Sequence, residues 1–175
     1  DNSPEIADKL RVIYDTAQKY KLYLLFHGGI SNFTRQINSK YHDVPKRSHT
    51  NALLKNFCSE DGQSELFENW NTPIIIAHIG HYGMINVNYD LLTLMVKRFG
   101  NVYFDTSGIS TSVIAKTLQI IPSTRIVFGS DAAYNRMVYN LAFLYNATAM
   151  MDSKERDNVL INMLSKNFYN KILKY

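Results

Sequence analysis

Short, continuous apolar runs alternate along the chain with longer stretches whose apolar residues recur every three or four positions. Continuous apolar runs are typical of strands that are buried on both faces, whereas the longer period predicts helices. Strands are expected near residues 22–27, 73–78, 101–105 and 125–130. Helices are expected at residues 4–20, 89–99, 112–119, 136–150 and 153–165.

The alternation of strand and helix predicts an α/β fold with four parallel strands in sequential order and helices outside them. One domain is the expectation for a chain of 175 residues. The connection over residues 31–72 is unusually long and rich in polar, aromatic and basic residues. It is predicted to hold two helices, near residues 51–57 and 64–70, and to act as a lid or an irregular excursion.

Composition narrows the class of protein. The chain is 46% hydrophobic and 19% charged, as in ordinary soluble globular proteins. The net charge of +4 is spread out rather than gathered on one face, which argues against a nucleic-acid partner. No apolar run approaches the roughly 20 residues of a membrane span, and no secretory leader is recognised. A single cysteine, Cys58, excludes an internal disulfide and fits a cytoplasmic location.

Each predicted strand ends in an ionisable side chain: in chain order His27, His78, Asp105 and Asp131. The carboxyl ends of parallel strands converge on the ligand in α/β proteins. Two histidines with carboxylates also form the donor set expected for zinc or a similar ion. The sequence therefore predicts a site at this edge of the sheet.

The same strand ends carry a family resemblance. The segments LLFHGG, IIIAHIG, VYFDTSG and IVFGSDAAY, in that order and spacing, resemble strands five to eight of the amidohydrolase-2 family. That family includes aminocarboxymuconate-semialdehyde decarboxylase and related metal-dependent hydrolases. The closing MLSKNFYNKIL resembles the family's terminal helix, so the resemblance extends over essentially the whole chain. It implies the C-terminal half of a TIM-type (β/α)8 barrel.

The resemblance also implies roles. His27 would be a metal ligand, His78 would polarise substrate or move a proton, and Asp131 would be a metal ligand or the base for the metal-bound water. The role implied for Asp105 and Ser107 is less uniform. The cofactor would be a divalent metal, with zinc as the expected ion. The reaction would be hydrolysis of an amide, ester or lactone in a small-molecule substrate, with non-oxidative decarboxylation as the alternative.

The chain departs from the family where the first strand should be. The family's strand-one His-x-His pair, which supplies two further ligands, has no counterpart here. We therefore expect strands one to four to be absent and the chain to begin mid-barrel; Asp1 in place of a methionine fits a fragment. The sheet edges at residues 22–27 and 125–130 would then be open. The expected partner is the missing N-terminal half or a second copy, and the fragment alone is expected to be inactive.

Two rival functions remain open at this point. A half-barrel that lacks metal ligands is compatible with a non-catalytic remnant that has a binding role. A different α/β enzyme acting on a phosphorylated substrate is less well supported, since the chain has neither a Gly-x-Gly-x-x-Gly motif nor a P-loop.

The candidate residues also have structural interpretations. His27 is alternatively a strand-end histidine that is hydrogen-bonded to a backbone carbonyl, although Gly28-Gly29 would let a backbone approach a ligand closely. His78 is alternatively a partly buried structural histidine. Asp131 is alternatively a cap for a helix beginning near Asn135, and Asp105 a cap for a helix beginning near Ser112. Five further residues have weaker support. His81, His42 and His49 are expected in loops or on the surface, and Tyr134 and Arg136 are candidates for binding an anionic substrate.

Overall fold

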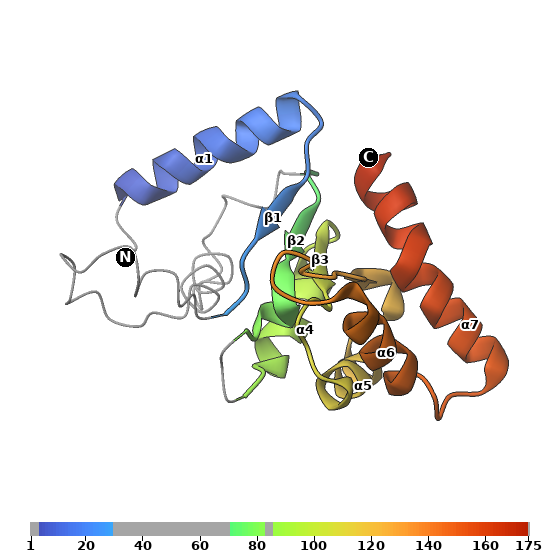
Figure 1. Cartoon of the computed structure of the whole chain (residues 1–175). Coiled ribbons are helices and arrows are strands. Elements are labelled where there is room, and N and C mark those ends of the chain that lie inside the picture. The colour runs from blue at the N-terminus through green and yellow to red at the C-terminus, as the bar shows by residue number, and fades with distance from the viewer. Residues whose placement is uncertain (1–3, 30–70, 83–85, 175) are drawn as a thin grey trace.

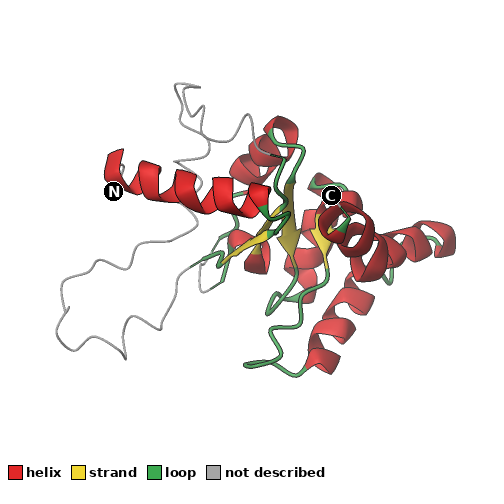
Figure 2. Ribbon diagram, turned by 90° about the horizontal axis from the view of Figure 1, so that it is seen from above, coloured by secondary structure: helices red, strands yellow, loops and turns green. Residues whose placement is uncertain are grey.

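A parallel sheet lies at the centre of the structure, with helices around it (Figures 1 and 2). The computed structural model describes residues 4–29, 71–82 and 86–174. Within this part, four strands follow one another in the order β1-β2-β3-β4, and all three neighbouring pairs are parallel. The strands are β1 Leu24–Phe26, β2 Ile74–Ile76, β3 Val102–Asp105 and β4 Ile126–Val127. The predicted order and direction of the strands are confirmed.

The helices also lie where the periodicity predicts them. They are α1 Pro4–Lys19, α4 Tyr89–Arg98, α5 Thr111–Ile120, α6 Met137–Ala147 and α7 Ser153–Ile161. At the start of α7 the Asp152 carboxylate accepts from the backbone N–H groups of Lys154 and Glu155, the bonds that an N-cap supplies. The last helix does not end near residue 165 as expected, because α7 continues without a break as a π-helix, Asn162–Leu173.

Two further points concern the long connection and membrane-spanning helices. The two helices expected between residues 51 and 70 lie outside the described residues. No helix in the described part of the chain is long and apolar enough to cross a membrane.

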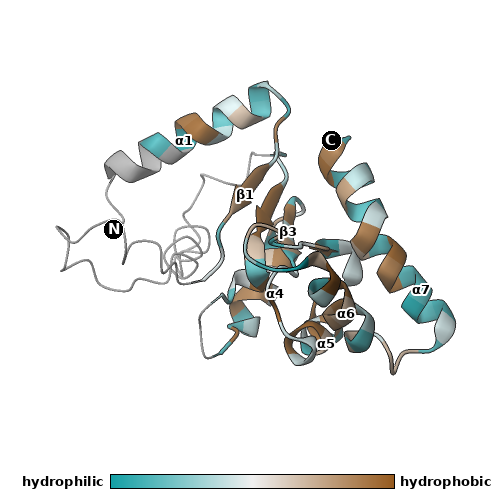
Figure 3. Ribbon diagram, viewed as in Figure 1, coloured by the Kyte–Doolittle hydropathy of each residue, from teal (hydrophilic) through white to brown (hydrophobic). Residues whose placement is uncertain are grey.

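One face of the sheet carries the main core. Alternate residues of the strands point to this face because successive side chains in a strand alternate. They pack with side chains from α4, α5, α6 and α7 in one buried cluster, whose strand members are Ile74, Ile76, Val102, Phe104 and Ile126. Figure 3 shows the strands as a continuous hydrophobic centre.

The opposite face is covered by the end of the chain. Ile75, Tyr103 and Val127 are each less than 10% exposed and pack with Phe168 and Ile172 of the π-helical continuation. Helices therefore do not lie on the outer face alone. The C-terminal helix crosses to the face that would be the interior of a closed barrel.

The same helix covers the β4 edge of the sheet. The Asn167 side-chain amide donates to the carbonyl oxygens of Ile126 and Ser123 at 2.6 and 2.7 Å. The Phe128 N–H donates to the Met163 carbonyl oxygen at 2.9 Å. The expectation of an open edge at residues 125–130 is therefore wrong, because helix groups take the place of a neighbouring strand.

The β1 edge is different. Among the described residues, β1 pairs with a strand on one side only. The Leu25 side chain is 60% exposed there, although leucine is a residue that normally packs in a core. The open edge expected at residues 22–27 stays a prediction.

Replacement of Asn167 tests the capping of the β4 edge. Asn167 is 3% exposed, so Asn167→Ala leaves two buried carbonyl oxygens without their donor. We expect the variant to lose about 1–3 kcal/mol of unfolding free energy in urea denaturation. The exposed Asn170, on the same helix, is the matched control, and Asn170→Ala should stay within about 0.5 kcal/mol of wild type. Equal losses in the two variants would contradict the capping role.

Candidate functional site

Three aromatic rings gather at the carboxyl ends of β1 and β2. His27 follows β1, His78 follows β2, and Tyr82 closes the turn after β2. The His27 and His78 ring centroids are 5.0 Å apart, and the Tyr82 ring lies 4.8 Å from His78 and 5.7 Å from His27. His78 is 6% exposed, whereas the His27 side chain is exposed. The structure thus brings the two predicted histidines together, one buried and one open to solvent.

Glycines after His27 allow the two strand ends to touch. A Cβ on Gly28 would lie 2.6 Å from the Gly80 Cα and would overlap the Ala77 carbonyl oxygen. Gly29 has φ +122° and pairs with Tyr82, whose N–H donates to the Gly28 carbonyl oxygen at 3.0 Å. From the sequence, the backbone at Gly28-Gly29 was expected to approach a ligand closely. The close approach is instead to the chain's own backbone, which holds His27 beside His78.

The His78 backbone adopts a left-handed conformation. Its φ is 58°, and that of Ile79 is 49°, within the short 3-10 turn Ala77–Gly80. Such angles are uncommon for residues other than glycine and are kept only where the surroundings hold them. Here the His78 N–H donates to Asp105 Oδ1 at 2.8 Å.

The Asp105 carboxylate at the end of β3 holds this part of the site. Besides the His78 N–H, its Oδ1 accepts from the Ser107 N–H at 3.0 Å and from the Ser107 hydroxyl at 2.5 Å. Asp105 is 8% exposed, and α5 begins only at Thr111 with Ser110 as its N-cap. The alternative interpretation of Asp105 as a helix cap is therefore wrong, because its carboxylate faces the β2 turn.

Asp131 lies in the turn that follows β4. It has φ 48°, and its carbonyl oxygen accepts from the N–H groups of Tyr134 and Asn135. Its Oδ2 accepts from the Asn135 side chain at 2.9 Å. Helix α6 begins at Met137 with Arg136 as its N-cap, so the Asp131 side chain is not the cap of α6.

Gly108 links the Asp131 turn to the histidines. A Cβ at Gly108 would lie 3.5 Å from Asn135 Nδ2, 3.7 Å from the Tyr82 ring and 3.8 Å from His78 Nδ1. Asn140, 2% exposed, accepts from the Gly108 N–H and donates to the Ser130 carbonyl oxygen. The ends of β2, β3 and β4 are therefore tied together on the edge of the sheet where they were predicted to meet.

Sequence reasoning missed some of these residues. Tyr82, Asn135 and Asn140 carry no motif, and only their contacts reveal them. Ser107 had a signal in the Asp-x-Ser-Gly segment, and its bond to His78 gives that segment a physical role. The catalytic roles of His78 and Asp131 and the metal-ligand roles of His27 and Asp131 stay predictions.

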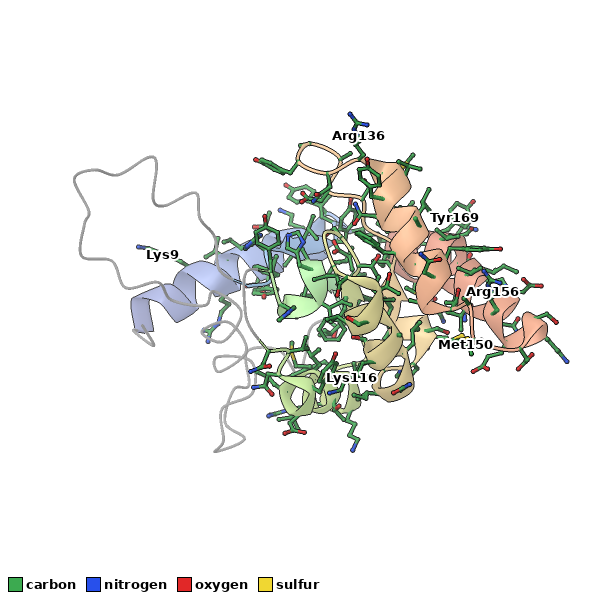
Figure 4. The ribbon with its side chains drawn as sticks, turned by 60° about the horizontal axis from the view of Figure 1, so that its bottom comes forward. Lys9, Lys116, Arg136, Met150, Arg156 and Tyr169 are labelled. Carbon is green, nitrogen blue, oxygen red and sulfur yellow. The ribbon has the colours of Figure 1, made fainter. Side chains whose placement is uncertain are left out.

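Other candidates take no part in this cluster. Tyr134 is 68% exposed, and Arg136 is exposed at the start of α6, where Figure 4 shows its side chain directed away from the rest of the molecule. His42, His49 and Cys58 lie outside the described residues. Over residues 4–29, 71–82 and 86–174, no group of three or more His, Cys, Asp or Glu side chains is placed to hold a metal ion.

Gly129 tests how tightly the Asp105 carboxylate is held. A Cβ at Gly129 would lie 2.8 Å from Asp105 Cγ and 2.9 Å from Oδ2, so Gly129→Ala must displace a buried carboxylate. We expect a loss of about 1–3 kcal/mol in urea denaturation. Gly100→Ala is the control, since its Cβ meets only the Arg125 side chain, at 4.0 Å. A Gly129→Ala variant as stable as the control would mean that the carboxylate moves freely.

The free energy of unfolding is expected to depend on pH through His81. Burial lowers its pKa below the ordinary value, and a backbone hydrogen bond with Asn86 opposes this in part. The unfolded chain therefore binds more protons than the folded chain between the lowered pKa and about 6.5. Stability should fall as pH drops below about 6.5 and level off below the folded-state pKa.

We expect His81→Gln to flatten this loss, measured as unfolding free energy against pH. Only the difference in slope between wild type and the variant reports His81, because other histidines titrate in the same range. Parallel slopes for the two proteins would contradict the prediction.

The comparisons with known proteins concern the fold and the family. The chain is similar in structure to 2,6-dihydroxybenzoate decarboxylase from Rhizobium, with a TM-score of 0.52 and 16% identity over 90% of this chain and 53% of that chain. For a structure of 2,6-dihydroxybenzoate decarboxylase complexed with 2,6-dihydroxybenzoate, the TM-score is 0.57 at 14% identity, covering 94% and 55% of the two chains. This chain thus spans just over half the length of either structure. A comparison with curated proteins finds no significant match.

At such identities the structural likeness shows the fold alone, a four-stranded parallel α/β arrangement consistent with half of a TIM barrel. The family comparison goes further, because residues 2–167 match the family Amidohydro_2, described as amidohydrolase. The predicted family is confirmed, and the chain belongs to the amidohydrolase-2 family.

Proposed function

We propose that this chain carries the C-terminal part of the active site of a metal-dependent hydrolase that activates water to cleave an amide, ester or lactone. The observation that carries the proposal is the pairing of His27 and His78, whose rings lie 5.0 Å apart at the ends of adjacent parallel strands. Convergence of ionisable side chains on the carboxyl ends of barrel strands is the arrangement that active sites in this fold use.

His27 and Asp131 are the proposed metal ligands. Imidazole and carboxylate are donors that zinc accepts, and His27 is open to solvent at the edge of the sheet. Asn135 holds Asp131 Oδ2, which orients the carboxylate. A catalytic zinc keeps three protein ligands, so it would need a donor beyond the part of the chain that the structure describes. When bound, such an ion lowers the pKa of a bound water to about 7.

His78 is the proposed acid–base residue. Its ring is buried against Tyr82 and His27, and its backbone is fixed by Asp105, so the imidazole has little freedom to move. A fixed imidazole beside the reaction centre is suited to moving a proton or steadying an oxyanion. Asp131 is proposed as the base that orients the attacking water.

A non-oxidative decarboxylase is the second candidate. The observation that favours it is the name of the solved structures, which are decarboxylases of 2,6-dihydroxybenzoate. The same histidine would then deliver a proton to the carbon that loses carbon dioxide. A small-molecule substrate is common to both candidates.

Activity is proposed to require a partner. The described chain ends its sheet at β1, where Leu22, Tyr23 and Leu25 are 52%, 40% and 60% exposed. Figure 1 shows α1 and β1 at one side of the sheet and the C-terminal helix at the other. The proposed partner is the N-terminal half of the barrel or a second copy of this chain, and the proposed location is cytoplasmic.

Zinc titration tests the proposed ligands. Because the described residues offer fewer than three donors in one place, we expect the 175-residue chain to bind zinc weakly, to lose it on dialysis and to turn over no substrate. Calorimetric titration should show the residual affinity falling further in His27→Ala and Asp131→Asn. Asp90→Asn, an exposed carboxylate in the first turn of α4, is the control and should bind as wild type does.

The outcomes separate the alternatives. Zinc that stays bound in stoichiometric amount through dialysis would show that this chain holds a complete site. Identical weak binding in His27→Ala and wild type would remove His27 from the ligand set and favour a non-catalytic remnant.

A further inference from the structure

A chain of hydrogen bonds runs from Asp105 through Ser107 to the His78 ring. The Ser107 hydroxyl donates to Asp105 Oδ1 at 2.5 Å, and the same hydroxyl oxygen lies 2.9 Å from His78 Nδ1. The Ser107 carbonyl oxygen lies 2.7 Å from that nitrogen as well. All three residues are less than 10% exposed, so water competes little for these bonds.

The protons in this chain can be assigned by elimination. Asp105 Oδ1 is approached by two backbone N–H groups, which can only donate, and by the Ser107 hydroxyl. The oxygen is therefore an acceptor, and the single hydroxyl proton of Ser107 is directed at it. Towards His78 the Ser107 hydroxyl oxygen can then only accept.

The Ser107 carbonyl oxygen also can only accept. Both groups that face His78 Nδ1 are thus acceptors, and Nδ1 must carry the hydrogen that joins them. A neutral imidazole has one N–H, so Nε2 is left with the lone pair. Which nitrogen of a histidine holds the proton is set by the bond that the other one makes.

We propose that Asp105 and Ser107 are positioning residues that hold His78 in the Nδ1–H tautomer and so make Nε2 the atom that takes up the proton in the reaction. The chemical part of this inference rests on the proposed function, whereas the tautomer does not. Asp105 has a second role besides its bond to Ser107. Its Oδ1 also accepts from the His78 backbone N–H, and this bond keeps His78 at φ 58°.

Two roles for the serine have different consequences. If Ser107 only fills space, its replacement leaves the tautomer to the carbonyl oxygen and Asp105 has no influence on the ring. If the chain acts as proposed, weakening the Asp105 acceptor frees the hydroxyl proton to turn towards Nδ1. Only the Ser107 carbonyl oxygen then still favours Nδ1–H, and part of the population exchanges its ring hydrogen, through solvent, to Nε2. The charge matters because bonds to an ionised carboxylate are about twice as strong as neutral ones.

Nitrogen NMR of histidine-labelled protein measures the tautomer directly. Long-range proton–nitrogen spectra of the full 175-residue chain are recorded over a series of alkaline pH values, and the tautomer is read where the spectra no longer change with pH. His78→Gln identifies the signals of His78. Wild type should show the Nδ1–H form, and an Nε2–H majority in wild type would overturn the inference without reference to any variant.

The variants test the positioning role. Asp105→Asn should raise the Nε2–H population severalfold, Ser107→Thr should keep the wild-type tautomer, and Ser110→Ala, an exposed hydroxyl on the same loop, is the control. A melting curve of each variant shows whether it is folded. A folded Asp105→Asn variant with an unchanged tautomer ratio would remove Asp105 from the positioning role.

Turnover separates this inference from the proposed function. In a preparation that turns over an ester or a 2,6-dihydroxybenzoate probe, Asp105→Asn should lower kcat by roughly 10- to 100-fold and leave KM within about twofold. Because the chain alone is expected to be inactive, turnover is measured with the chain assembled with its proposed partner. An Nδ1–H tautomer without turnover of either probe in that assembly would count against the proposed function and leave the tautomer assignment intact. Turnover with unchanged kcat in Asp105→Asn would overturn the assignment of Nε2 as the atom positioned for proton transfer.

Discussion

One carboxylate oxygen organises the functional edge of this protein. Asp105 Oδ1 accepts from the His78 backbone, from the Ser107 backbone and from the Ser107 hydroxyl, all within 3.0 Å. A buried carboxylate is costly unless donors surround it, and here the donors belong to the β2 turn and the β3 loop. The oxygen therefore joins two strand ends and fixes the ring of the residue proposed to move a proton. Gly129 belongs to the same unit, since only a residue without a Cβ lets β4 end beside that carboxylate.

The two edges of the sheet differ in the part of the chain that the structure describes. At β4 the C-terminal helix supplies a side-chain amide and a backbone carbonyl where a strand would otherwise pair. At β1 the described residues supply a partner strand on one side only, next to exposed Leu25. At β4 these groups of the C-terminal helix already occupy the edge, so a further strand has fewer free backbone groups to bind there.

Periodicity was enough to predict much of the fold, and the strand ends were enough to predict that His27 and His78 lie close together. Four apolar runs gave the parallel order because a strand buried on both faces has a distinctive pattern, and His27 and His78 followed because each ends such a run. What could not be predicted depends on contacts between distant segments. Asn167 is hydrogen-bonded to Ile126 of β4, 41 positions earlier in the sequence. Ser107 is hydrogen-bonded to His78, 29 positions earlier. The Gly28-Gly29 pair signalled a close approach correctly, but no local pattern says whether a ligand or a backbone approaches.

The backbone conformations add an argument that is independent of any motif. Among the described residues, four that are not glycine have positive φ: Lys21, His78, Ile79 and Asp131. A left-handed residue of this kind costs on the order of 1–3 kcal/mol and persists only where its surroundings hold it. His78 and Asp131 are both held, one by Asp105 and the other by the turn that ends at Asn135. His78 follows β2 and Asp131 follows β4, where the candidate site lies, while the strained Ile79 beside His78 is buried in the core. The groups that hold the two strained backbones, the Asp105 carboxylate and the turn that ends at Asn135, therefore also keep two of the candidate site residues in place.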